Sequence, residues 1–400
     1  MDEVRMVRDS YPEPAPPTAR EIAQAKALLN EPPRRSPSRL RWGLGGVLAA
    51  AAAATAAITL VGGNTVVGGN TPGGGKAVAQ PGTVNLDARG AILAAAEKAE
   101  QQPIGKYWYI DQIDGQSYIM RPKTGTYAIT GAHSEMFSWW GAKSGMGEGH
   151  YGRDLPAHPL TAQDAALWRK DGSPSSFRVW SGDHYYTYTA RAQKWQMDGP
   201  ERGTDPRGGG GGFVGAPGMS VKDLQNLPAD PAKLAERFLS DEALAKRVDP
   251  SGRSAGRREG LRLPPSVKIS MAGALAMDPV PPKVRAGLMR ALADQPGIHA
   301  IGRDSDPLDR EGVALASDDR ATTVTGEYGG PKAERGTYRS RAVIVFDERT
   351  GAVLSVQEEL TKPGGPYSEM KPGFVINYIA YRSAGWTDAK PKPQAELPFS

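Results

Sequence analysis

The side chains that could carry out chemistry are few and scattered along the chain. There is no cysteine, so a thiolate nucleophile, a zinc–thiolate site and a disulfide framework are all excluded. No G-x-S-x-G motif occurs, which argues against an α/β-hydrolase mechanism. The histidines have neither the H-E-x-x-H spacing nor a pairing on one helix, so a zinc hydrolase is not expected. They are His133, His150, His158, His184 and His299.

Three stretches have motif-like spacing but lack a required feature. Ser368 and Lys371 form an S-x-x-K pair in a Pro/Gly-rich loop, which cannot provide the helical turn that aligns hydroxyl and amine. The acidic stretch 304–312 lacks the glycine and the closing glutamate of a calcium loop, so we interpret it as a hydrated hairpin turn. Asn70 and Ala77 occupy positions where a P-loop needs Gly and Ser or Thr. The sequence therefore predicts no catalytic residue, no metal site and no cofactor.

Aromatic residues are concentrated in one part of the chain. Six of the eight tryptophans and eight of the fourteen tyrosines lie between Tyr107 and Trp195. Alternate side chains of a strand point to opposite faces of a sheet, so Tyr107 and Tyr109 share one face while Trp108 and Ile110 share the other. Both faces of this sheet are therefore expected to carry aromatic side chains.

Two interpretations of these aromatics remain open. One face is the core and the other is a partly exposed surface, since aromatics dominate ordinary cores. Alternatively, the second face binds a lipid, a glycan or an envelope protein, because exposed aromatic patches usually mark binding. The candidate residues for such a surface are Trp108, Trp139, Trp140, Tyr185 and Tyr186.

The elements that position these residues begin with a helix near 87–101. The strand patterns at 106–110 and 116–120 flank Asp114-Gly115, a dipeptide typical of a β-hairpin turn. More strand patterns follow up to residue 189, and five successive glycines lie in a predicted disordered loop, 199–219.

Helices and further strands complete the pattern. Asp230 caps a helix with Pro231 at its first position, and Val284, Leu288 and Leu292 lie on one face of a second helix. Strand patterns then return, with a tight turn over residues 347–351. Strands, a helical middle and strands again predict one α+β domain over 86–388, with a curved, half-barrel-like antiparallel sheet covered by helices on one face. A Pro-rich tail, 389–400, follows.

The longest apolar run indicates a membrane anchor. Residues 42–61 carry no charge, and a helix of that length spans about 30 Å, the thickness of the hydrocarbon core. Four arginines precede the run, which orients the N-terminus towards the cytoplasm; they are Arg34, Arg35, Arg39 and Arg41. A cleaved signal, with a small-x-small site at 77–80, and a soluble Ala-rich helix are the alternatives.

This anchor divides the chain into a cytoplasmic head (1–41), a single transmembrane helix, a Gly-rich tether (62–85) and an extracytoplasmic domain. The net charge of +5 is mild and its clearest concentration flanks the apolar run, so no nucleic-acid partner is expected. A capping box formed by Thr18 and Glu21 predicts a short helix in the head, which could bind a cytoplasmic partner.

Several signatures resemble a family of uncharacterised single-pass membrane proteins of high-GC Gram-positive bacteria. The resemblance implies a D-E-x-x-R head, one transmembrane helix and an outer α+β domain, but no activity. Its residues are Asp2, Glu3 and Arg5; Tyr107, Trp108 and Tyr109; Leu227, Pro228, Asp230, Pro231 and Leu234; and Asp347, Thr350 and Gly351. The order of elements is more distantly similar to the half-barrels of lipoprotein carriers and of periplasmic sigma-factor regulators.

Together these features predict a non-enzymatic, membrane-anchored envelope protein with an extracytoplasmic sensing or binding domain that could be regulatory. One alternative is a carrier that holds a lipid or another apolar ligand in its half-barrel. A second alternative is a cell-wall enzyme whose acidic residues gather only in three dimensions.

Overall fold

A computed structural model describes residues 86–399, apart from 144, 182–183, 198–212, 214, 249–262 and 328. These residues belong to one compact unit, Leu44–Ser400. The predicted head, transmembrane helix and tether, and much of the predicted loop 199–219, lie outside the described residues. Within the described part of the chain, no helix has both the length and the apolar character needed to cross a membrane.

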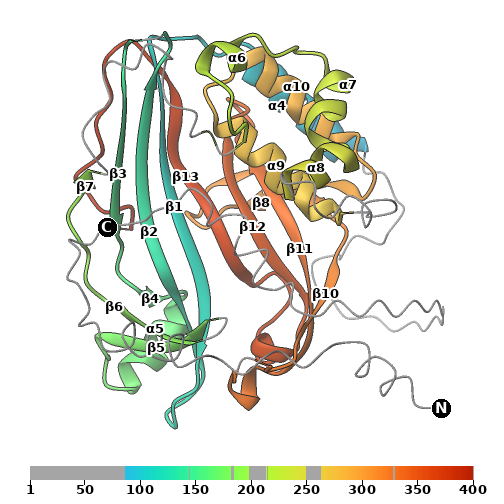
Figure 1. Ribbon diagram of the computed structural model, residues 1–400. Coiled ribbons are helices and arrows are strands. Elements are labelled where there is room, and N and C mark those ends of the chain that lie inside the picture. Colours follow the sequence, from blue (N-terminus) through green and yellow to red (C-terminus); the bar gives the residue numbers. More distant parts are fainter. Residues whose placement is uncertain are drawn as a thin grey trace, which may run out of the picture. The chain divides into compact units, whose positions relative to one another are not determined.

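Antiparallel strands form one large sheet (Figure 1). Its eleven strands follow the order β7-β3-β2-β1-β13-β12-β11-β9-β8, with β10 paired to β11 and β4 paired to β2. The sheet is not closed, because its end strands β7 and β8 are not paired with each other in the described residues. The strands are β1 (Tyr107–Met120), β2 (Tyr127–Gly141), β3 (Glu148–Asp154), β4 (His158–Pro159), β7 (Gln196–Met197), β8 (Ile298–Ser305), β9 (Glu311–Ser317), β10 (Arg320–Val324), β11 (Gly336–Phe346), β12 (Val353–Lys362) and β13 (Val375–Thr387).

The last strand of the described residues, β13, lies in the middle of the sheet. β13 pairs with β1 from Tyr107↔Thr387 onwards and with β12 on its other side. It therefore joins strands from the two ends of the domain, so the sheet is complete only when the C-terminal residues have been added.

The predicted hairpin at Asp114-Gly115 is wrong, because both residues lie inside the continuous strand β1. Asp114 pairs with Ser134 of β2, and Gly115 pairs with Tyr378 of β13. A Cβ atom on Gly115 would come within 2.4 Å of the Tyr378 ring. The glycine thus permits the close approach of an aromatic ring and does not form a turn.

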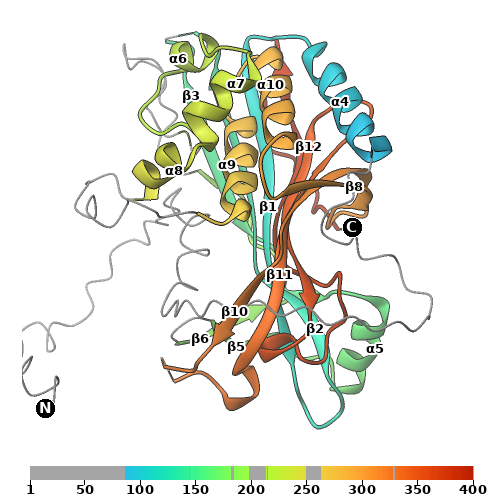
Figure 2. The ribbon, with the colours of Figure 1, turned by 90° about the vertical axis from the view of Figure 1, so that its right-hand side faces the viewer.

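Helices from the middle of the sequence and one helix before β1 pack against the sheet (Figures 1 and 2). α9 contacts β9, β11 and β12, and α10 contacts α4, α9 and β8. The α+β class is therefore confirmed. The helices of this layer are α4 (Leu86–Glu100), α6 (Val221–Gln225), α7 (Pro231–Leu234), the π-helix η1 (Ala235–Leu239), α8 (Asp241–Val248), α9 (Pro265–Met277) and α10 (Pro282–Ala293).

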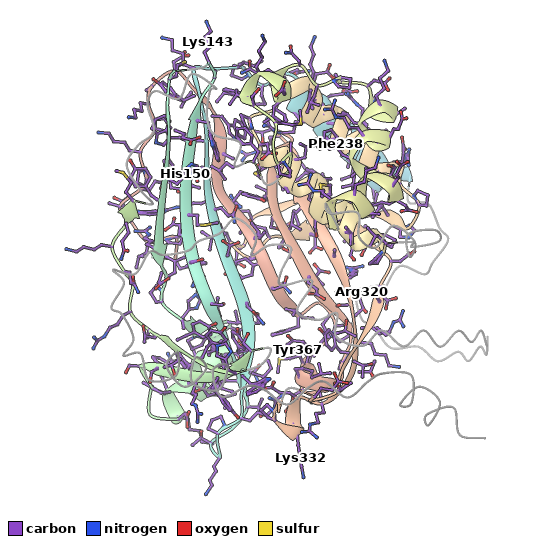
Figure 3. The ribbon with its side chains drawn as sticks, in the orientation of Figure 1. Lys143, His150, Phe238, Arg320, Lys332 and Tyr367 are labelled. Atoms are coloured by element: carbon purple, nitrogen blue, oxygen red, sulfur yellow. The ribbon has the colours of Figure 1, made fainter. Side chains whose placement is uncertain are left out.

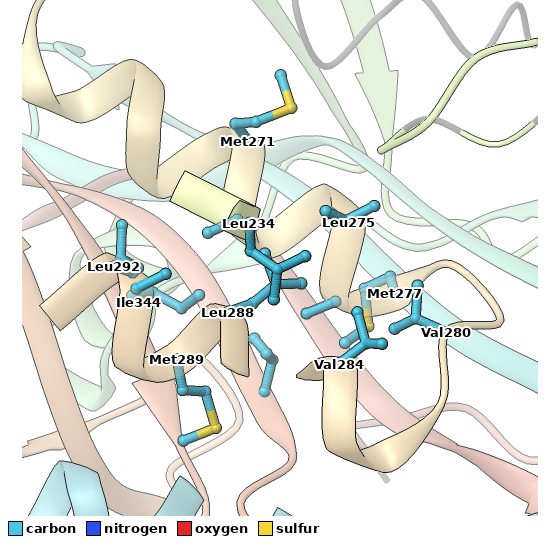
Figure 4. Close-up of a cluster of buried hydrophobic side chains, with 14 of the residues drawn as sticks. Leu234, Met271, Leu275, Met277, Val280, Val284, Leu288, Met289, Leu292 and Ile344 are labelled. Atoms are coloured by element: carbon cyan, nitrogen blue, oxygen red, sulfur yellow. The ribbon is translucent and has the colours of Figure 1, made fainter. Parts of the chain in front are cut away.

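The main apolar core fills the layer between these helices and the sheet. Side chains of α7, α9 and α10 interdigitate with Ile344 of β11 (Figure 4). α9 has no polar stripe facing solvent, since most of its second half is buried. Gly273 lets it approach the sheet, because a Cβ there would lie 2.5 Å from Val356.

Two predicted local features are confirmed. The Asp230 side chain accepts a 2.9 Å hydrogen bond from the Lys233 amide and caps α7, with Pro231 at the first helical position. The turn after β11 is built by Asp347, which accepts hydrogen bonds from two following amides, and by Gly351 at φ +67°. A Cβ on Gly351 would lie 2.1 Å from a carbonyl of α4, so this turn locks the sheet to the helix.

A smaller group of elements occupies the opposite end of the sheet from the turn containing Lys143 (Figure 3). It includes a separate two-stranded sheet, β5–β6, whose neighbouring helix carries the capping box of Thr161 and Asp164. These elements are α5 (Ala162–Lys170), β5 (Ser176–Ser181), β6 (His184–Thr189) and the 3₁₀ turns η3 (Lys332–Glu334) and η4 (Gly365–Tyr367).

Candidate functional site

The strands β1, β2, β3 and β13 present two chemically different faces. Trp108 and Ile110 of β1 point into the core beneath the helices. Between and beyond them, Tyr109, Asp111 and Ile113 point to the other side, as the alternation of a strand requires. We call this second side the outer face.

Aromatic side chains line one end of the outer face. Tyr107 packs edge-on against Trp139 with ring centroids 5.7 Å apart. Tyr109 stacks on Phe137 at 6.0 Å. This part of the face is apolar, with Trp139 and Phe137 almost fully buried.

Next to these aromatics lie four charged side chains, one from each strand, which we call the acid–arginine cluster: Asp111, Glu135, Arg153 and Arg382. Glu135 is fully buried and forms ion pairs with both Arg153 and Arg382. The Arg382 Nη1 to Glu135 Oε1 distance is 3.2 Å. Because removing one partner of a buried ion pair leaves an uncompensated charge, the cluster is held together as a unit.

Asp111 is the unusual member of the cluster. It is fully buried, and neither of its carboxylate oxygens has a hydrogen-bond donor among the described residues. Burial, followed by the nearby Glu135 carboxylate, raises the pKa of Asp111 to about 8. The two carboxyl groups are close enough to share a proton, which supplies the missing donor. With that proton, the cluster carries one net positive charge.

The C-terminal segment (residues 388–399) lies over the outer face and binds the cluster through its backbone. Three consecutive carbonyls accept hydrogen bonds from side chains: Gln394 from Trp195 Nε1 at 2.7 Å, Ala395 from Arg153 Nη1 at 2.9 Å, and Glu396 from Arg153 Nη2 at 2.7 Å. Arg382 Nη1 also donates to the Glu396 carbonyl at 2.9 Å. The excess positive charge of the cluster is therefore directed at carbonyl oxygens, which are good acceptors for guanidinium groups.

Stacking contacts flank this backbone recognition. The Arg153 guanidinium lies 4.4 Å from the centroid of the Trp195 ring. Lys390 of the C-terminal segment lies 4.5 Å from the Trp139 ring. Such cation–π contacts add to the hydrogen bonds and exclude water from them.

Two apolar side chains complete the contact of the segment with the outer face. Leu397 packs against the cluster that contains Ile113 and Leu155. Phe399 lies against two imidazole rings, 5.1 Å from His133 and 5.2 Å from His158 between centroids. Phe399 nevertheless stays 40% exposed, so this end of the segment is only partly sheltered.

His133 is held neutral at the end of the segment. Burial lowers its pKa to about 4. Its Nδ1 lies 2.9 Å from the Pro156 carbonyl and must carry the proton, because a carbonyl can only accept. Nε2 is then an acceptor for the Tyr378 hydroxyl at 3.4 Å.

The structure does not bring the five predicted surface residues together. Trp108 and Trp140 are buried beneath the helices, where Trp108 donates a 2.7 Å hydrogen bond to the Met277 carbonyl and Trp140 packs on Phe213. Trp139 lies on the outer face but is 1% exposed. A ligand could therefore not reach these three rings without displacing the residues that cover them.

Tyr185 and Tyr186 lie on β6, in the separate two-stranded sheet, and are 46% and 40% exposed. Tyr185 packs against Arg178, whose guanidinium is 4.1 Å from the ring, and edge-on against Trp180 at 5.1 Å. A binding role for this pair stays a prediction.

The acid–arginine cluster was not predicted from the sequence. One signal was present, since Asp111 follows Tyr107 and Tyr109 at strand spacing and so shares their face of the sheet, where it places a charge beside aromatic side chains. The other members come from residues 135, 153 and 382, and nothing local in the sequence indicates that these meet.

The remaining motif-like stretches adopt simple roles. The stretch 304–312 joins β8 to β9, where the Asp306 carboxylate is buried and accepts from Arg310 and from two amides. The predicted turn is confirmed; within it Asp306 is enclosed by protein, whereas Asp309 is exposed. Ser368 donates to Glu369 at 2.8 Å and not to Lys371. Among the described residues, no group of three or more His, Asp or Glu side chains is arranged to hold a metal ion.

Comparison with known proteins adds one weak similarity. No protein-family model matches the sequence, and no curated protein sequence matches it. Among solved structures, the chain matches the crystal structure of LprF from Mycobacterium bovis at a TM-score of 0.22 and 8% identity, covering 78% of this chain and 99% of LprF. A similarity at this TM-score carries no argument, so the predicted family membership stays a prediction.

Proposed function

We propose that this chain is a non-enzymatic, membrane-anchored envelope protein whose extracytoplasmic domain binds or senses a ligand on its outer face. The observation that carries the proposal is the acid–arginine cluster. Its two arginines donate three hydrogen bonds to two carbonyls of the chain's own C-terminal segment, those of Ala395 and Glu396. Guanidinium donors that point from a sheet face towards carbonyl acceptors are typical of a binding site. In this proposal the apolar run 42–61 is the anchor, and the N-terminal head 1–41 passes a signal to a cytoplasmic partner.

A cell-wall enzyme is the rival supported by one observation, the pairing of Asp111 with Glu135. These carboxyl groups are close enough to share a proton. Glycosidases need about 5 Å or more between their two carboxyl groups, so that a sugar or a water fits between them. Because Glu135 is also held by two arginines, the pair fits a binding or proton-sensing role better than acid–base catalysis.

The carrier alternative treats the curved sheet as a half-barrel that holds an acyl chain beneath its helices. In the described residues, that layer is packed with side chains of α9, α10 and the sheet (Figure 4). Native mass spectrometry of the purified full chain separates the alternatives, because a carrier retains a bound lipid mass whereas the proposed binding protein does not.

Location and binding are tested separately. Protease added to intact cells that produce the full chain is expected to degrade the domain and to leave an epitope in residues 1–41 intact. A protected domain, or one released into the medium, would refute the membrane-anchored arrangement.

Binding is tested by hydrogen–deuterium exchange of the full chain in detergent, with and without a detergent extract of the cell envelope. We expect exchange to change in β1, β2, β3 and residues 388–399 and to stay constant in α9 and α10. An unchanged outer face would contradict the proposed binding surface.

A further inference from the structure

We infer that the ligand of the outer face is a proline-containing peptide, and that the C-terminal segment is its resident competitor. This inference rests on the proposed binding function and names its ligand class. The site that holds the segment, called the tail site below, consists of His133, Trp139, Arg153, His158, Trp195 and Arg382.

The hydrogen bonds of the tail site recognise peptide backbone. The acceptors on the segment are the carbonyls of Gln394, Ala395 and Glu396, which any peptide can supply. All three donors are side chains with rigid planar groups, an indole and two guanidinium forks. Two of them are fixed by their ion pairs with Glu135, so the donors are positioned before a peptide binds.

Proline suits this mode of binding. The segment contains Pro391, Pro393 and Pro398, which lack an amide hydrogen and favour an extended backbone. The tail site donates hydrogen bonds to carbonyls only, so a peptide whose prolines lack amide hydrogens makes the same hydrogen bonds to it. Because proline restricts the conformations of the free peptide, such a segment also loses less conformational entropy on binding.

Side-chain selectivity comes from two apolar positions with one residue between them. Leu397 enters the cluster around Ile113 and Leu155, and Phe399 lies on His133 and His158. The ligand class is therefore a peptide that presents two or more carbonyls, followed by an aliphatic and then an aromatic residue, in the bent conformation that residues 395–399 adopt here.

The resident segment is held loosely enough to exchange. Residues 394–396 are exposed on their solvent side, and Phe399 keeps 40% of its surface exposed. Because the segment is tethered to β13, a partner peptide competes against a local concentration that is on the order of millimolar for a short linker. Weakening the resident segment should therefore reveal binding in trans.

The test uses a fluorescein-labelled peptide with the sequence of residues 388–400 and the full chain in detergent. Fluorescence anisotropy compares the wild type with a full chain carrying L397A and F399A. We expect the doubly substituted chain to bind the peptide at least tenfold more tightly than the wild type. I104A, which shortens a 60% exposed apolar side chain outside the tail site, is the matched control and should bind like the wild type.

A second peptide, with alanine at the positions of Leu397 and Phe399, should bind the doubly substituted chain at least tenfold more weakly. If that variant is poorly folded by near-ultraviolet circular dichroism, F399A alone replaces it, since Phe399 is at the exposed end of the segment. Equal binding by wild type and variant, or equal binding of both peptides, would overturn the inference. An outer face that responds to envelope extract but not to these peptides would leave the proposed function intact and reject only the peptide ligand.

Discussion

Asparagine in place of Asp111 should make the domain more stable in mild alkali. Asp111 is fully buried and its pKa is raised to about 8, first by burial and then by Glu135. The folded protein thus retains a proton that the unfolded chain releases near its ordinary pKa of 3.8. The stability linked to this proton is fully present below pH 4 and is lost as the pH rises to about 8. Asparagine has the shape of the protonated acid and cannot ionise.

The magnitude follows from the pKa. One pKa unit corresponds to ~1.4 kcal/mol, so a rise from 3.8 to about 8 sets a ceiling of about 6 kcal/mol at pH 8.5. The proton is shared with Glu135 and the arginines compensate part of the charge, which leaves an expected difference of about 2 to 3 kcal/mol.

The assay is urea unfolding of the wild type and D111N at pH 5 and pH 8.5. We expect D111N to be the more stable protein at pH 8.5 and the wild type to lose more stability between the two pH values. D114N is the matched control on the same strand, because the pKa of Asp114 is raised only to about 6 and its effect ends near that pH. Parallel pH profiles for D111N and the wild type would mean that Asp111 is ionised throughout, and the shared proton would have to be abandoned.

Three further outcomes follow from other contacts. G351A should destabilise the domain by about 2 kcal/mol or more, since Gly351 has φ +67° and an added Cβ would lie 2.1 Å from the Ala95 carbonyl; thermal unfolding checks this. G90A lies on α4 with no atom near the added Cβ, so it should instead stabilise the domain by about 0.5 to 1 kcal/mol. A lower stability of G90A would contradict the packing of this helix. Burial lowers the pKa of His133 to about 4, so its stabilising contribution is present above pH 6.5 and lost as the pH falls through 4. The protection of amides at the end of the C-terminal segment, measured as the exchange rate relative to the intrinsic rate at the same pH, should fall in that acid window, because Phe399 packs on this imidazole. Unchanged protection would mean that the charge of His133 does not affect the segment.

Features set by short-range interactions were predictable from the sequence. The cap at Asp230 and the turn from Asp347 to Gly351 need only neighbouring amides and one left-handed glycine. Asp114-Gly115 has equally strong local signals, yet it lies within a strand because Tyr378 of β13 needs the space above Gly115. A prediction from local sequence is wrong here because the conformation at Gly115 depends on an aromatic ring that is distant in the sequence.

α9 was missed for a related reason. Residues 265–277 are apolar on nearly every side, so the helical period that would indicate an amphipathic helix is absent. Only the sheet on one side and α10 on the other explain why such a segment is fully helical. The predicted membrane helix at 42–61 lies outside the described residues, and its insertion stays a prediction.

The acid–arginine cluster illustrates the same limit for function. Its four residues come from β1, β2, β3 and β13, and Arg382 is separated from Asp111 by most of the domain. Each residue by itself resembles a surface charge in a strand. Only the insertion of β13 beside β1 places Arg382 next to Glu135 and completes the set.

This topology ties completion of the sheet to closure of the outer face. β13 is the last strand of the described residues, it pairs with both β1 and β12, and it leads directly into the C-terminal segment. Arg382 lies fourteen residues before Glu396, whose carbonyl it binds, so the outer face is covered by residues of the same chain that follow directly on β13. A partner peptide must then compete with the segment after folding, which makes exposure of the tail site, and not its assembly, the step at which binding can be controlled.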